Sequence, residues 1–109
     1  MKKHHLLTAV LFLAAASSAA AAEAKANWDD NCAKCHGADG KGQTKMGKKL
    51  SIRDYTDAKV QATFTDEEAL KALKEGVKDK EGKLRMKPVE ELSADDMKAL
   101  VQFVRSLKA

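Results

Sequence analysis

The chain has few residues of the kinds that bind metals or form disulfides: two cysteines and three histidines among 109 residues. Two cysteines allow at most one disulfide. The longest apolar run covers residues 6–16 (LLTAVLFLAAA), well short of the roughly 20 residues that span a bilayer. No segment alternates apolar and polar residues as a half-buried strand does, and no internal repeat is present. These absences argue against a membrane-spanning protein, a sheet and a repeat array.

The N-terminus has the three parts of a secretory signal peptide. Lys2 and Lys3 precede the apolar run, and residues 17–22 (SSAAAA) supply the small residues of a cleavage site. We predict that residues 1–22 are a signal peptide cleaved after Ala22, which leaves residues 23–109 as one small domain exported to the periplasm. The alternative, a membrane anchor, is disfavoured because the apolar run is too short.

The two cysteines lie in the segment Cys32-Ala33-Lys34-Cys35-His36. This is the C-x-x-C-H pattern of a c-type haem attachment site. Each thiol can form a thioether with one haem vinyl group, and the histidine that follows can bind the iron. Loss of the signal peptide removes His4 and His5, so His36 is the sole histidine of the predicted mature chain. We therefore predict one covalent haem c, held by Cys32 and Cys35 and ligated by His36.

Three other interpretations of the cysteine pair are weaker. A disulfide across two residues closes a very small loop and constrains little of the unfolded chain. A thioredoxin-like redox site requires a strand-helix-strand setting that the sequence lacks. A structural zinc site needs a fourth ligand, and the mature chain offers no further cysteine or histidine.

Helical patterns surround the motif. In the segment Ala24 to Lys34, residues 24, 28 and 32 are four apart, so Trp28 shares a helical face with the first cysteine and is expected to fill the core. Residues 37–47 are rich in glycine, which we interpret as a loop passing close to a flat, bulky ligand.

Two further helices have clear start signals. Thr65 and Glu68 form a capping box, Leu70, Leu73 and Val77 form an apolar edge, and Gly76 is a stop signal. A last helix opens at Ser93 with acidic residues in its first turn. Its apolar stripe comprises Met97, Leu100, Val101, Val104 and Leu107. The predicted fold is all-α, with three to four helices and loops around one haem.

The second axial position of the iron must be filled by something other than histidine. Methionine, lysine or a vacant site are the options, and three methionines follow residue 22. Met97 lies on the apolar stripe, where core filling is the usual role. Met46 follows His36 closely, so its loop would have to pass around the macrocycle within a few residues. Met86 is favoured because it lies in an irregular segment that Pro88 keeps out of a helix.

The sequence from residue 23 onward resembles the class I cytochromes c, above all the small monohaem cytochromes of bacterial periplasms. The resemblance rests on the segment 32–37, the glycine-rich loop ending near Leu50, and Met86-Lys87-Pro88 before the closing helix. It implies His36 and Met86 as axial ligands, and a crossing of the first and last helices through Phe103. Two features depart from the family pattern: Lys48 follows Gly47 where a proline is frequent, and Lys87 separates Met86 from Pro88.

These features predict an electron carrier with no catalytic residues. If the sixth position were open, a gas-binding sensor or a peroxidase-like enzyme would be the alternative.

The net charge of the full-length chain is +4, and loss of Lys2 and Lys3 reduces it to +2. Lysines and arginines gather at residues 34–53 and 78–87, so redox partners with acidic docking surfaces are expected. We expect no binding of nucleic acid, no stable membrane insertion after cleavage, and a monomer.

Overall fold

A computed structural model describes residues 19–109. Residues 1–18, which make up most of the predicted signal peptide, lie outside the described part. The first described element is a helix over residues 19–31, and its inner face is buried at Ala24, Trp28 and Cys32, as the four-residue spacing predicts. No helix within residues 19–109 combines the length and the apolar character needed to cross a bilayer.

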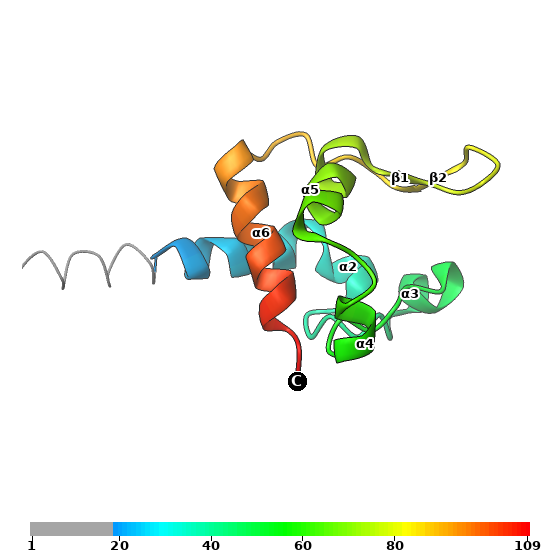
Figure 1. The fold of residues 1–109 in the computed structure, drawn as a ribbon, viewed down its shortest axis with the longest axis horizontal. Helices are drawn as coiled ribbons and strands as arrows, with labels where there is room; N and C mark the ends of the chain where they lie inside the picture. Colours follow the sequence, from blue (N-terminus) through cyan, green and yellow to red (C-terminus); the bar gives the residue numbers. More distant parts are fainter. Residues whose placement is uncertain (1–18) are drawn as a thin grey trace, which may run out of the picture.

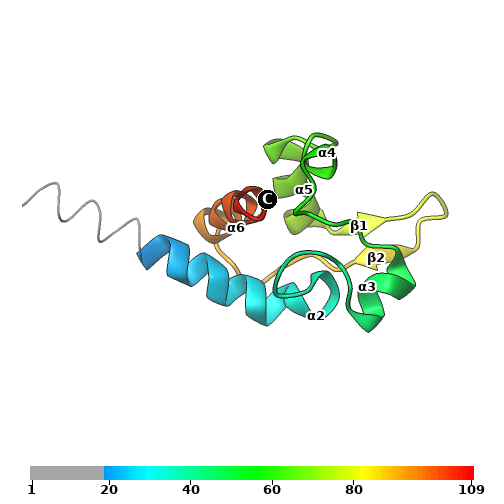
Figure 2. The same cartoon turned by 90° about the horizontal axis from the view of Figure 1, so that it is seen from below.

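The N-terminal helix crosses the last helix, α6 (Ala94–Ser106), near the middle of the molecule (Figures 1 and 2). The Trp28 and Phe103 rings meet at this crossing, with centroids 5.4 Å apart. This confirms the crossing that the resemblance implied for Phe103. Trp28, Cys32 and Leu100 form the fully buried cluster, and partly buried residues including Leu73, Val104 and Leu107 pack around it. Trp28 is thus a core residue, as expected.

Helices α5 (Asp66–Glu75) and α6 begin at the predicted start sites, the first at its predicted capping box and the second at a capping box that was not predicted. Thr65 Oγ1 accepts from the Glu68 backbone N–H at 3.0 Å, and Glu68 Oε1 accepts from the Thr65 N–H at 3.0 Å. Ser93 and Asp96 form the equivalent pair at the start of α6. Because each box satisfies backbone donors that a helix start leaves unpaired, both start sites could be identified from local sequence.

Helix α5 ends at Gly76, so Val77 is not part of its apolar edge; that part of the prediction was wrong. Gly76 has a φ of 78°, and a Cβ there would lie 2.6 Å from the Met86 carbonyl oxygen. The chain turns at this point into a short antiparallel hairpin of β1 (Val77–Lys78) and β2 (Leu84–Met86), in which Val77 pairs with Met86. The hairpin is a small addition to a mainly helical fold.

Three short helices complete the described elements around the motif. Helix α3 (Lys45–Leu50) begins at Thr44, whose hydroxyl accepts from the Gly47 N–H at 2.8 Å and donates to the Cys35 carbonyl at 2.5 Å. Helix α4 (Ala58–Gln61) lies in the connection that leads to α5. The third, α2 (Ala33–His36), carries the motif itself.

The glycine-rich loop is packed against the protein's own backbone. A Cβ at Gly47 would lie 2.6 Å from the Cys35 carbonyl oxygen, and one at Gly42 would lie 2.8 Å from the Ile52 carbonyl oxygen. These glycines therefore let segments of one chain approach each other; close passage of a flat ligand stays a prediction. The loop thereby fixes the backbone that follows the C-x-x-C-H motif.

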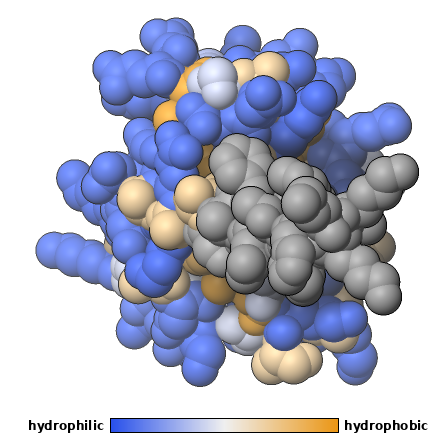
Figure 3. Space-filling model, turned by 90° about the vertical axis from the view of Figure 1, so that its left-hand side faces the viewer, coloured by the Kyte–Doolittle hydropathy of each residue, from blue (hydrophilic) through white to orange (hydrophobic). Residues whose placement is uncertain are grey.

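Helix α3 and the hairpin project at the same end of the molecule in both ribbon views (Figures 1 and 2). The opposite end is seen in Figure 3, where hydrophilic residues dominate the surface around the grey atoms. The exposed large apolar side chains, in contrast, lie on α3 and the hairpin: Met46, Val77 and Leu84. The end that carries α3 and the hairpin thus has exposed apolar side chains among its charged ones.

Candidate functional site

The C-x-x-C-H motif lies where the N-terminal helix passes into α2. The Cys32 carbonyl accepts from the N–H groups of Cys35 at 3.2 Å and His36 at 2.9 Å, so the motif forms a tight turn. The Trp28 indole N–H donates to the Gly37 carbonyl at 3.0 Å and fixes the exit from α2. Both cysteines are free thiols. The turn brings Cys32 and His36 to the same side of the chain.

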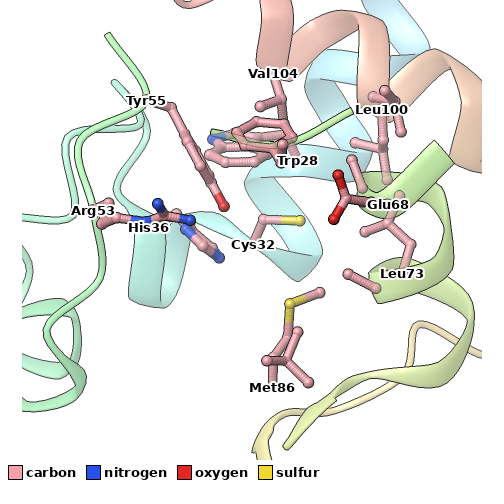
Figure 4. Close-up of a pocket in the computed structure, with 15 residues that line it drawn as sticks. Trp28, Cys32, His36, Arg53, Tyr55, Glu68, Leu73, Met86, Leu100 and Val104 are labelled. Atoms are coloured by element: carbon pink, nitrogen blue, oxygen red, sulfur yellow. The ribbon is translucent and has the colours of Figure 1, made fainter. Parts of the chain in front are cut away.

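Two adjoining hollows open beside the motif. The first has a volume of about 780 Å³ including its open mouth, and the second about 1530 Å³ on the same measure. Cys32, His36 and Met86 line both of them, and Figure 4 shows the three side chains on the walls of the first. The remaining lining of the first is mostly apolar and includes Leu73, Leu100, Val101 and Val104. Together the hollows offer space for a large, flat, mainly apolar group.

Burial sets the protonation of the motif residues. Burial, and to a lesser degree the neighbouring Cys35, raises the pKa of the Cys32 thiol to about 11. Burial also lowers the pKa of His36 below its ordinary value. The imidazole is therefore held in its neutral form, which is the form that binds metals.

Two aromatic rings surround the His36 imidazole. The Tyr55 ring is stacked on it, with centroids 5.3 Å apart and planes 20° apart, and the Trp28 ring lies 5.5 Å away at 42°. The His36 Nδ1 atom is buried and has no hydrogen-bond partner among the described residues. The imidazole is thus positioned by ring contacts.

The three candidate methionines differ in position. Met86, at the end of β2, is half-buried and lines both hollows, although we had expected it in an irregular segment. Met46 is 38% exposed on α3 and lines the larger hollow. Met97 is buried in α6 and lines neither, in line with core filling.

Several residues of the first hollow were not predicted from the sequence. Tyr55 and Phe64 come from the segments before and after α4, Arg53 lies just before Tyr55, and Glu68 lies in the first turn of α5. Tyr55, Phe64 and Arg53 belong to no spaced motif, and Glu68 was marked only as part of the capping box, so no local signal pointed to the hollow. Their position depends on the tertiary path of the chain between α3 and α5.

The described residues fit a covalent haem better than a zinc ion. Within residues 19–109, no group of three histidine, cysteine or acidic side chains is placed to share a metal ion. A haem, in contrast, requires an apolar hollow with thiols and an imidazole at its wall. Cys32, Cys35 and His36 supply those groups at the wall of the larger hollow.

Comparisons with known proteins agree with this fit. The profile of the Cytochrome c family matches residues 21–108. A solved structure described as "KustC0563 c-type cytochrome" is 35% identical in sequence and superposes with a TM-score of 0.66, covering 78% of this chain and 96% of its own. No curated protein sequence matches closely enough to count as a relative. The predicted all-α cytochrome fold is confirmed, and one haem c is the cofactor that this family binds. The chain belongs to the cytochrome c family, as a small monohaem member of class I.

Proposed function

We propose that the protein is a periplasmic electron carrier in which Cys32 and Cys35 anchor one haem and His36 and Met86 are its axial ligands. Membership of the cytochrome c family supports the coarser function, a haem-based electron carrier. The observation that carries the finer assignment is that Cys32, His36 and Met86 line the walls of the same two hollows.

The haem, when bound, supplies one-electron exchange at its iron. The residues of the chain have separate tasks. The thiols of Cys32 and Cys35 fix the macrocycle, and His36 presents a neutral imidazole on one side. The soft thioether of Met86 favours the reduced iron and so raises the reduction potential. Two axial side chains leave no position for a substrate, which suits a carrier and not an enzyme.

The position of Met86 is held from two directions. Its strand pairs with β1, where Val77 is its partner, and Gly76 allows the Met86 carbonyl to approach closely. The adjacent Arg85 donates from Nη2 to the Leu50 carbonyl at 2.5 Å, which connects β2 to the end of α3. These contacts support Met86 as the ligand because its backbone is fixed beside the hollows.

Export is part of the proposal. Residues 1–22 have the charge and apolar pattern of a signal peptide, and residues 23–109 form the cytochrome c domain. Covalent haem attachment to free thiols fits an exported protein.

A spectrum of the oxidised holoprotein tests the ligand assignment. We expect low-spin ferric iron, a methionine-to-iron charge-transfer band, and no binding of carbon monoxide to the reduced protein at neutral pH. The physical reason is that both axial positions are filled by strong ligands. A high-spin ferric spectrum, or ready carbon monoxide binding, would replace the carrier with the sensor or peroxidase-like alternative.

The end of the molecule that carries α3 and the hairpin is suited to an acidic redox partner. Its exposed basic side chains are Lys45, Lys48, Lys49, Lys78, Lys80, Lys83, Arg85 and Lys87. Met46, Val77 and Leu84 are exposed among them and supply apolar contact area. The hairpin also carries Asp79 and the exposed Glu81, so basic side chains are in excess there. An excess of one charge steers an oppositely charged partner during diffusion and so raises the association rate.

Electron transfer to an acidic partner is expected to slow as ionic strength rises, because salt screens attraction between exposed charges. Reversal of one hairpin charge, Lys80→Glu, is expected to lower the rate constant severalfold at low salt and to flatten its salt dependence. Lys98→Glu, an exposed position on α6, is the matched control. Stopped-flow kinetics across a salt series measure both effects. Equal losses in the two variants would show that only net charge matters.

A further inference from the structure

The buried Nδ1 atom of His36 lacks the partner that a metal-binding histidine normally has. Such a histidine usually donates its second ring N–H to a carbonyl or carboxylate, which fixes the ring orientation. Here the atom has no hydrogen-bond partner among the described residues. The departure from the family pattern is at Gly47-Lys48, and both carbonyls there accept from backbone N–H groups and not from His36. The Gly47 carbonyl accepts from the Ile52 N–H at 2.9 Å, and the Lys48 carbonyl accepts from the Ser51 N–H at 3.3 Å.

Ring stacking occupies the place of that hydrogen bond. The Tyr55 ring is nearly parallel to the His36 imidazole, at 20° and 5.3 Å between centroids. The Trp28 ring contacts the imidazole from a second direction and is itself held by its bond to the Gly37 carbonyl. Figure 4 shows Tyr55 and Trp28 beside His36 at one side of the pocket. Two rings on one imidazole restrict its rotation by shape.

Tyr55 is anchored by a buried polar residue. The side-chain amide of Gln61, only 6% exposed, donates to the Tyr55 carbonyl at 2.7 Å and to the Val104 carbonyl of α6 at 2.9 Å. Tyr55 N–H also donates to the Gly40 carbonyl at 2.9 Å. The Tyr55 backbone is thus tied both to the glycine-rich loop and to the last helix.

Arg105 of α6 fixes Gln61 in turn. Its Nη1 atom donates to the Gln61 side-chain oxygen at 2.9 Å and to the Gln61 carbonyl at 2.6 Å. Its Nε atom donates to Asp66 at 2.7 Å, and this bond lowers the pKa of the Asp66 carboxyl. Because the Gln61 oxygen is occupied by Arg105, its amide nitrogen must face the Tyr55 carbonyl. A chain of contacts therefore leads from α6 to the imidazole.

We infer that Tyr55, held by Gln61, is a positioning residue that sets the orientation of the His36 imidazole by stacking, in place of a hydrogen bond to Nδ1. The inference rests on the proposed role of His36 as an axial ligand. Under this inference, the aromatic ring of Tyr55, and not its hydroxyl, determines the orientation of the imidazole. Gln61 affects this orientation only by holding the Tyr55 backbone.

Paramagnetic proton NMR of the ferric holoprotein tests the inference, because haem methyl shifts follow the orientation of the axial ligand planes. Tyr55→Leu is expected to change the order and spread of these shifts, whereas Tyr55→Phe retains the wild-type pattern. Leu70→Ala is the control for a general loss of packing: Leu70 is half-buried on α5 and is not among the residues that line either hollow. Gln61→Leu is expected to shift the pattern in the same direction as Tyr55→Leu.

A methyl pattern that is unchanged in a folded Tyr55→Leu protein would overturn the inference, as would an equal change in Leu70→Ala. An exchange-protected, strongly hydrogen-bonded His36 Nδ1–H in the wild type, seen by nitrogen-15 NMR, would also overturn it. If Tyr55→Leu fails to fold, Gln61→Leu decides the question, because it removes the anchor and keeps the ring. Failure of the proposed function is seen separately, as an absence of imidazole ligation in the wild-type protein itself.

Discussion

Replacing Met86 with alanine is expected to abolish the methionine-to-iron charge-transfer band and to lower the reduction potential by about 0.1 V or more, within the roughly 0.8 V that axial ligands span. The thioether stabilises the reduced iron, so its loss favours the oxidised form. The opened position is also expected to admit carbon monoxide. Optical spectra and a redox titration measure these changes.

The other methionines supply matched controls for that experiment. Met46→Ala alters a half-exposed side chain on α3 at the wall of the larger hollow, and is expected to leave the band in place. Met97→Leu alters a core residue of α6 and is expected to change stability alone, by less than about 1.5 kcal/mol. A charge-transfer band that survives in Met86→Ala and disappears in Met46→Ala would identify Met46 as the axial ligand.

Replacing both Cys32 and Cys35 with serine is expected to destabilise the domain by most of the roughly 3–5 kcal/mol that one core supplies in a small domain. The fully buried cluster of the described residues is small and is built around Trp28 and Leu100. We expect the apolar walls of the two hollows to pack against the covalently held haem, so that the haem completes the core. Without the thioethers, the haem dissociates when the chain unfolds. The refolded domain then lacks the covalent group that stabilises it.

Two measurements check this expectation. Haem staining after denaturing electrophoresis reports covalent attachment, and thermal unfolding followed by circular dichroism reports stability. Lys34→Ser, at the exposed position between the two cysteines, is the control and is expected to match the wild type in both. A double variant that unfolds at the wild-type temperature would show that the apolar core suffices alone.

The parts of the fold that could be predicted are those determined by local chemistry. The capping boxes at Thr65 and Ser93 are read from four consecutive residues each, and the burial of Trp28 follows from helical spacing. Helix α3 has a local N-cap in Thr44, which accepts from the Gly47 N–H, but its place beside the motif depends on the bond from Thr44 to the Cys35 carbonyl, nine residues away. No window of neighbouring residues contains that information.

The hairpin was missed for a different reason. Its strands are two and three residues long, rich in lysine and arginine, and largely exposed, so they show no alternation. Its turn is set by Asp79, whose carboxylate accepts from the N–H groups of Glu81 and Lys83, both at 2.9 Å. The same limit applies to the site: C-x-x-C-H is a local pattern, whereas Tyr55 reaches His36 only through the tertiary path that Gln61 and Arg105 fix.

The base and the tip of the hairpin have different surroundings, so they are suited to different roles. At its base, Met86 pairs with Val77 and its carbonyl lies against Gly76. At its tip, the space around Gly82 is open within 4 Å, although the φ of 81° favours glycine at that position itself; Lys80, Glu81 and Lys83 beside it are exposed. Substitutions or insertions at the tip can therefore change which partner is recognised while the residue at the base stays in place. Under the proposed roles of Met86 and the hairpin, partner choice and redox potential can be engineered independently in this chain.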